Sequence, residues 1–174
     1  MEAAASCGGG GGLREQELAL TEETLEDSTN KAVVTALYAA LSNRNAEAIK
    51  KILAADLEWW FHGPPSHQFL MLLLTGEQES EFRFVPHSIS AFGSTVLAEG
   101  FDQSSSIAWV HAWTVADGII TGVREYFNTS VTVARIVKNE QLDCSIGSLH
   151  CPSVWESSFP GRVGKSVPGL VLAI

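Results

Sequence analysis

The sequence predicts an α+β fold in which helices come first and a curved antiparallel sheet is wrapped around them. Three observations predict it. Residues 28–76 carry apolar residues mostly at helical spacing, the apolar period changes to two from Phe82 onward, and 174 residues suit one domain of ordinary size. Helices followed by a run of strands are typical of folds whose helices pack on one face of a sheet.

Two helices are expected first. Ser28, Thr29 or Asn30 can cap the first helix, whose apolar residues share one face: Val33, Val34, Leu37, Tyr38 and Leu41. Asn45 can cap the second, "AEAIKKILAA". The residues before this region, 1–27, are rich in glycine and acids and predict a flexible tail.

An aromatic strand and a third helix follow. The strand spans Asp56–His62 and is bounded by Gly63-Pro64-Pro65. Alternation places Leu57, Trp59 and Phe61 on one face and Glu58, Trp60 and His62 on the other, without showing which face lies inside. Pro65 and Ser66 favour a helix start, and Gly76 is expected to end that helix.

Four further strands are predicted in the second half: Phe82–Phe92, Thr95–Phe101, Ser106–Val115 and Ile119–Thr129. Pro86 has no N–H to donate, which places the first of them at an edge or at a bulge. Asp117-Gly118 is the strongest hairpin turn in the chain.

Composition excludes several function classes. The net charge is -9, from 11 Lys and Arg against 20 Asp and Glu, which disfavours a nucleic-acid partner. The longest apolar run, Phe69–Leu74, is far short of the about 20 residues that a membrane helix needs. The N-terminal residues resemble neither a secretory nor a transit peptide, so we expect the cytoplasm, with the nucleus as an alternative. Three cysteines without a C-x-x-C pair and poorly spaced histidines predict no metal and no cofactor.

The stretch "SIAWVHAWTV" is the centre of the predicted site. Alternation places five residues on one face: Ile107, Trp109, His111, Trp113 and Val115. Small residues occupy the other face. An imidazole between apolar walls resists protonation, which predicts a neutral His111.

The neighbour of His111 depends on the turn at Asp117-Gly118. A two-residue turn places Arg124 opposite His111. A three-residue turn places Val123 there, with Glu125 near Trp109, and Asp followed by Gly favours this form. His111 with Glu125 or Arg124 is thus the candidate catalytic pair, because an imidazole beside a carboxylate can transfer protons.

Three short motifs carry a resemblance: "WWFHGPP", "HAWTV" with "DG" and "IT" after it, and "REYFNT". They resemble the plant wound-induced protein 1 family, a SnoaL-like branch of the nuclear transport factor 2-like superfamily. The C-terminal stretch Leu149–Ala173 resembles the same plant family. The resemblance implies a cone-shaped α+β domain over residues 28–137 and a family-specific extension over 138–174. It also implies a role in wounding, senescence and stress, with no established chemistry.

Superfamily isomerases hold acids on the first strand and on the penultimate strand of the meander, where this chain has Phe61 or His62, and His111. That difference disfavours proton abstraction of the isomerase type. We therefore expect a stress-response protein with an apolar pocket, either a non-enzymatic binder of an apolar small molecule or a homodimer formed through the sheet face. The alternative is a SnoaL-like cyclase, isomerase or dehydratase. The predicted pocket residues are Trp59, Phe61, His62, Phe69, Trp109, His111, Trp113, Val123, Glu125 and Phe127.

Overall fold

The computed structural model describes residues 24–76, 81–135, 153–159 and 170–174. The structure does not describe residues 1–23 of the predicted tail 1–27, most of the predicted extension 138–174, or any of the three cysteines. Residues 24–27, which were predicted as part of the tail, instead cap and begin the first helix. Within the described residues the order of elements is three helices interleaved with one strand, then a run of strands, which confirms the predicted α+β class.

The helices are α1 (Leu25–Ser42), α2 (Ala46–Ile52), the short 3-10 turn η1 (Pro65–His67) and α3 (Phe69–Thr75). Helix α1 starts three residues before the predicted caps, because Thr24 and Asp27 form a capping box. Ser28, Thr29 and Asn30 therefore lie inside the helix. The predicted caps at Asn45 and Gly76 are confirmed: the Asn45 side chain accepts from the Ala48 amide, and Gly76 has φ 70°.

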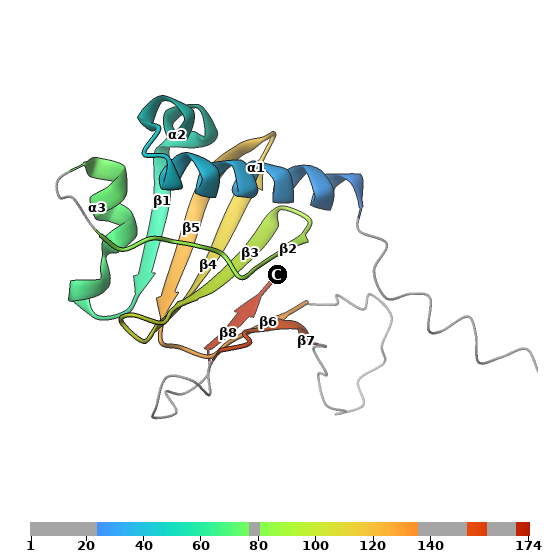
Figure 1. The fold of residues 1–174 in the computed structure, drawn as a ribbon. Helices are drawn as coiled ribbons and strands as arrows, with labels where there is room; N and C mark the ends of the chain where they lie inside the picture. Colours follow the sequence, from blue (N-terminus) through green and yellow to red (C-terminus); the bar gives the residue numbers. More distant parts are fainter. Residues whose placement is uncertain (1–23, 77–80, 136–152, 160–169) are drawn as a thin grey trace, which may run out of the picture.

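Five strands form the main sheet in the order β1-β5-β4-β3-β2. They are β1 (Leu53–His62), β2 (Ser88–Phe92), β3 (Thr95–Asp102), β4 (Ile107–Ala116) and β5 (Ile119–Phe127). Strands β2 to β5 are the predicted antiparallel meander, whereas β1 joins β5 in parallel, so this edge differs from the all-antiparallel expectation. Helix α1 runs across one face of the sheet, called the inner face below (Figure 1).

The predicted strand Phe82–Phe92 is shorter than expected, because only Ser88–Phe92 pairs with β3. Residues 81–87, called the cover segment, instead run as extended chain across the inner face from α3 to β2 (Figure 1). Pro86 lies in it, and proline has no N–H to give to a ladder. Buried and exposed side chains still alternate along this segment: Phe82 and Phe84 are buried, while Arg83 and Val85 are exposed.

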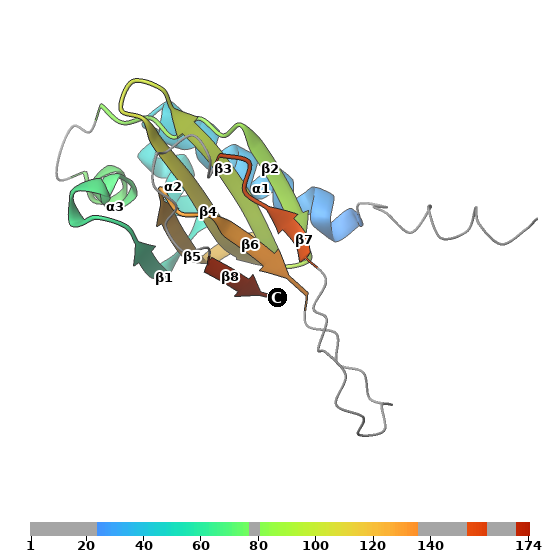
Figure 2. The same ribbon diagram turned by 90° about the horizontal axis from the view of Figure 1, so that it is seen from below.

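A second sheet covers the outer face of the main sheet. It consists of β6 (Val131–Ala134), β7 (Ser153–Glu156) and β8 (Leu170–Ala173), in the order β7-β6-β8 (Figure 2). An apolar cluster joins the two sheets: Leu97, Val110, Ala112, Tyr126, Val131, Val133 and Leu172. The sheet face through which we expected a homodimer to form is thus covered at its centre by the chain itself. Among the described helices, none combines the length and apolar character that crossing a membrane requires.

Candidate functional site

The inner face of β4 carries the predicted aromatic centre. Trp109, His111 and Trp113 point into the large apolar cluster under α1, whereas Val110 and Ala112 belong to the outer cluster. The predicted alternation along this strand is confirmed. His111 and Trp113 have no exposed surface, and Trp109 has 1%. These rings fill the interior between sheet and helix.

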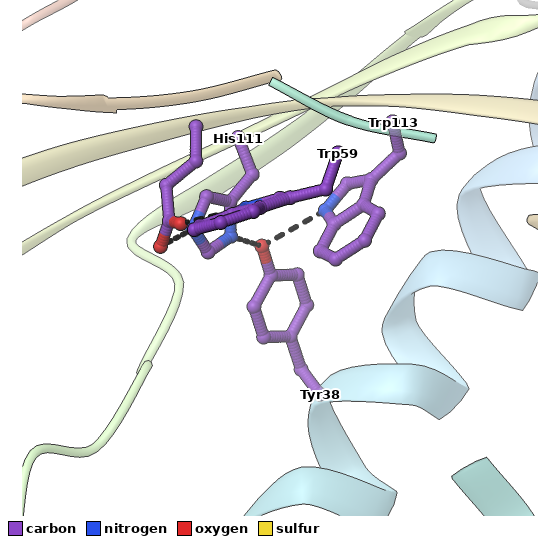
Figure 3. Close-up of polar contacts among 5 residues, drawn as sticks. Tyr38, Trp59, His111 and Trp113 are labelled. Carbon is purple, nitrogen blue, oxygen red and sulfur yellow. Dashed lines mark hydrogen bonds and ion pairs between the residues drawn. The ribbon is translucent and has the colours of Figure 1, made fainter. Parts of the chain in front are cut away.

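Five side chains from four elements form one hydrogen-bonded chain (Figure 3). The Trp113 indole N–H donates to the Tyr38 hydroxyl oxygen at 3.0 Å, and that hydroxyl lies 2.7 Å from His111 Nδ1. His111 Nε2 lies 3.1 Å from Glu125 Oε1. The Trp59 indole N–H donates to Glu125 Oε2 at 3.1 Å. Tyr38 comes from α1, Trp59 from β1 and Glu125 from β5.

One proton arrangement satisfies every polar atom of this chain. Tyr38 donates its proton to His111 Nδ1, and the N–H on His111 Nε2 donates to an ionised Glu125. A protonated His111 would instead donate from Nδ1, and no acceptor among the described residues would remain for the Tyr38 proton. Because unpaired buried donors are costly, the network favours a neutral His111 and a carboxylate at Glu125.

Electrostatics keep Tyr38 protonated. Burial raises the pKa of Tyr38 well above its usual range, and the charge of Glu125 raises it further, while the hydrogen bond from Trp113 acts in the opposite direction. The hydroxyl is therefore a donor at any ordinary pH. Glu125 itself is fully buried, and the partners it contacts in the network are neutral N–H groups.

Neither predicted hairpin register is correct. Asp117-Gly118 forms a two-residue turn with φ of 50° and 78°, and Ala116 pairs with Ile119. One extra residue, Thr121, then bulges from β5 between two ladder pairs. The bulge shifts the remaining ladder by one residue, so that His111 lies opposite Glu125. The expected contact between His111 and Glu125 is present, but for a different reason.

Strand β1 settles which tryptophan lies inside. Trp59 and Phe61 pack against the inner cluster, whereas Trp60 is 59% exposed. Two predicted site residues lie on the wrong face. His62 stacks on Tyr126 on the outer face, and the exposed Arg124 pairs with Trp60 there, so neither reaches His111. The outward positions of His62 and Arg124 both follow from strict alternation along β1 and β5 once Trp59 is placed inside.

The other predicted residues meet on the inner face. Phe69, Phe127 and Val123 belong to or pack against the same apolar cluster as His111's neighbours. Sequence interpretation missed two residues, Tyr38 and Phe84. A tyrosine among apolar positions of a helix was the available indication for Tyr38, since its buried hydroxyl needs a partner. For Phe84 it was the alternation with Phe82.

The network does not open directly onto a large groove. A shallow groove of about 380 Å³ lies between α1 and the cover segment, and we call it the mouth groove. Its lining is Thr35, Tyr38, Ala39, Ser42, Phe84, Val85, Pro86, His87, Ser88 and Ile89. Tyr38 and Phe84 thus belong both to its floor and to the buried centre. In the described part of the chain, no three His, Cys, Asp or Glu side chains are grouped as metal ligands would be.

Known proteins with similar folds include bacterial structures. A nuclear transport factor 2-like protein from Burkholderia xenovorans is 25% identical, with a TM-score of 0.46, covering 60% of this chain and 92% of that one. A protein described as a SnoaL-like polyketide cyclase from Jannaschia is 14% identical, with a TM-score of 0.47, covering 62% and 90%.

Plant relatives are much more similar in sequence. "Wound-induced protein 1" of Solanum tuberosum is 61% identical over 107 residues, which are 60% of this chain and 100% of the relative. "Senescence associated gene 20" of Arabidopsis thaliana is 58% identical over 110 residues, with the same coverage. The family model for Wound-induced protein WI12 matches residues 71–174. That stretch contains His111, Trp113 and Glu125, whereas Tyr38 and Trp59 precede it. On this match, the chain belongs to the wound-induced protein WI12 family.

Proposed function

We propose that this protein is a non-enzymatic stress-response protein that binds an apolar small molecule in the mouth groove. The names of its plant relatives support the response to wounding and senescence. One observation carries the binding proposal: Tyr38 and Phe84 line an open groove of about 380 Å³ and also contact the buried aromatic centre. Ligand sites are typically concave, largely apolar, and supplied with a few polar groups.

The alternative, a SnoaL-like cyclase, isomerase or dehydratase, has one observation in its favour. His111 Nε2 and Glu125 Oε1 are 3.1 Å apart, as an acid/base pair requires. Both side chains have no exposed surface, and all their polar atoms already have partners. A reacting molecule would have to break these hydrogen bonds before either group could act, which makes binding the better supported function.

The mouth groove offers a matched pair of variants. Ala39 and Ala36 are both exposed alanines of α1, one turn apart, but only Ala39 lines the groove. Ala39→Trp fills the groove with an indole, whereas Ala36→Trp places the same group elsewhere on the helix. Both variants should fold, because neither substitution enlarges a buried position.

The test is a binding screen of uncharged apolar compounds by thermal shift and tryptophan fluorescence. We expect compounds that raise the melting temperature of the wild type and of Ala36→Trp, with binding weakened at least about ten-fold by Ala39→Trp, the equivalent of 1.4 kcal/mol. Equal binding to both variants would place the ligand outside the mouth groove. Absence of any apolar ligand for the wild type would overturn the proposal.

A further inference from the structure

We propose that Phe84 occupies the place of the ligand's own ring, and that the natural ligand carries an uncharged planar aromatic group that replaces Phe84 above His111. This inference rests on the proposed function and names the class of ligand for the same site. It makes the free protein a self-occupied form, in which a side chain of the cover segment fills the site.

The surroundings of Phe84 are those of a bound aromatic ligand. Its ring centre lies 4.8 Å from that of His111 and 5.1 Å from that of Trp109, which meets it edge to face at 88°. Phe82 flanks it at 4.9 Å, also edge to face. These distances and angles are those that aromatic rings prefer. A planar ring of another molecule would find the same neighbours.

The main chain holds Phe84 less firmly than a strand would. Across the described residues, the main chain of 83–86 makes no hydrogen bond, and the first one follows where the His87 amide donates to the Glu99 carbonyl at 2.7 Å. In the strand that follows, every residue from Ser88 to Phe92 has a ladder partner. Ring packing is therefore what keeps Phe84 inside, and an incoming ring can replace that packing contact for contact.

Movement of Phe84 would also connect the two spaces. Its ring separates the mouth groove from His111, since Phe84 lines the groove on one side and contacts the imidazole on the other. Val85 next to it is 66% exposed, so the chain already reaches solvent one residue further on. A ring resting in the groove would thus lie next to the space that Phe84 vacates.

The charge of the site decides between kinds of aromatic ligand. The polar atoms of His111 and Glu125 are already paired, so the vacated space offers ring faces rather than free hydrogen-bond groups. Glu125 is a buried carboxylate bound by neutral donors, and a second anion beside it would be repelled. A neutral ring fits this space, and an aromatic acid does not.

The experiment compares wild type, Phe84→Ala and Arg83→Ala, with indole as the neutral probe and benzoate as the anionic one. Binding is measured by calorimetry, after circular dichroism has shown that each variant is folded. We expect Phe84→Ala to bind indole at least about ten-fold more tightly than the wild type, because the competing ring is gone. Arg83→Ala changes the other neighbour of Phe84, which is exposed and does not line the mouth groove, and it should match the wild type. Benzoate should bind to none of the three.

Two results would overturn the inference. One is indole binding to Phe84→Ala that is no tighter than to the wild type. The other is benzoate binding to Phe84→Ala as well as indole does. If Phe84→Ala is unfolded, Phe84→Leu removes the ring with a smaller loss of volume and should show the same order of affinities. If ligands do not bind in the mouth groove at all, the comparison of Ala39→Trp with Ala36→Trp detects this separately.

Discussion

Tyr38 is the residue on which the polar network depends, since it accepts from Trp113 and donates to His111. Tyr38→Phe leaves Trp113 Nε1 and His111 Nδ1 buried without hydrogen-bond partners. We expect it to lower the free energy of unfolding by about 2–4 kcal/mol, because each unpaired buried group costs about 1–3 kcal/mol. Urea unfolding measures the difference. Trp60→Phe, at an exposed position of β1, should change stability by less than about 0.5 kcal/mol. Equal values for the two variants would show that the network contributes no stability.

For single residues, the sequence predicted which face of a strand a side chain lies on better than it predicted which residue that side chain contacts. Period-two alternation was enough to place Trp109, His111 and Trp113 on one face. It could not choose between Trp59 and Trp60, since both faces of β1 carry large side chains. The role of Tyr38 required knowing how α1 crosses the sheet, and that geometry is set by tertiary packing. Whether the predicted residues bind a ligand stays a prediction.

Among the elements, the start of α1 is held by a carboxylate, so its contribution to stability can be tested by varying the pH. The Asp27 carboxylate accepts from the Gly93 amide at 2.6 Å and thereby joins the helix to the turn between β2 and β3. Burial alone would raise the pKa of Asp27, but the hydrogen bonds from Thr24 and from the Gly93 amide outweigh it and lower the pKa below its usual range.

A lowered pKa in the folded state means that the ionised Asp27 stabilises the protein above its unfolded pKa of about 3.9, and that this stabilisation is lost as the pH falls through the folded pKa. We expect Asp27→Asn to cost about 1 kcal/mol at pH 7 and nothing near pH 2, because a charged acceptor gains about that much over a neutral one. Chemical unfolding across this pH range measures it. Glu26→Gln, in the same turn, is the control, and an Asp27 effect independent of pH would contradict the assignment.

The elements that differ from prediction share a cause. The bulge at Thr121 depends on how β5 fits between β4 and β1, and nothing in the local residues requires it. The cover segment has the alternation of a strand, but Pro86 and its path over the inner face keep it out of the ladder. Alternation indicates which side chains are buried and does not indicate which neighbour receives the hydrogen bonds.

For the whole molecule, the covered outer face changes where a homodimer could form. Strands β6 and β8 occupy the centre of that face, so a second copy would have to use what remains exposed there. Trp60 is 59% exposed on β1, and Val171 on β8 is 71% exposed. A contact surface would need these side chains to act as one contiguous apolar patch, because single exposed apolar residues are common on monomers. Self-association through Trp60 and Val171 is our second candidate property.

If the homodimer exists, Trp60→Thr should shift it to monomer, because removing a central aromatic anchor costs about 2 kcal/mol or more of binding free energy. Sedimentation velocity over a range of concentrations measures this. Val85→Thr, which changes an equally exposed apolar residue in the cover segment, should leave the oligomeric state unchanged. A wild type that remains a monomer at high concentration would exclude the dimer.

The parallel edge strand has a consequence for how the chain folds. Strands β2 to β5 are neighbours in sequence and can pair one after another, but 66 residues along the chain separate Trp59 from Glu125. Bringing such distant segments together is entropically slow. We therefore expect β1 to join the sheet after strands β2 to β5 have paired. In that intermediate, Glu125 is already in place on β5 but does not yet accept the hydrogen bond from the Trp59 indole.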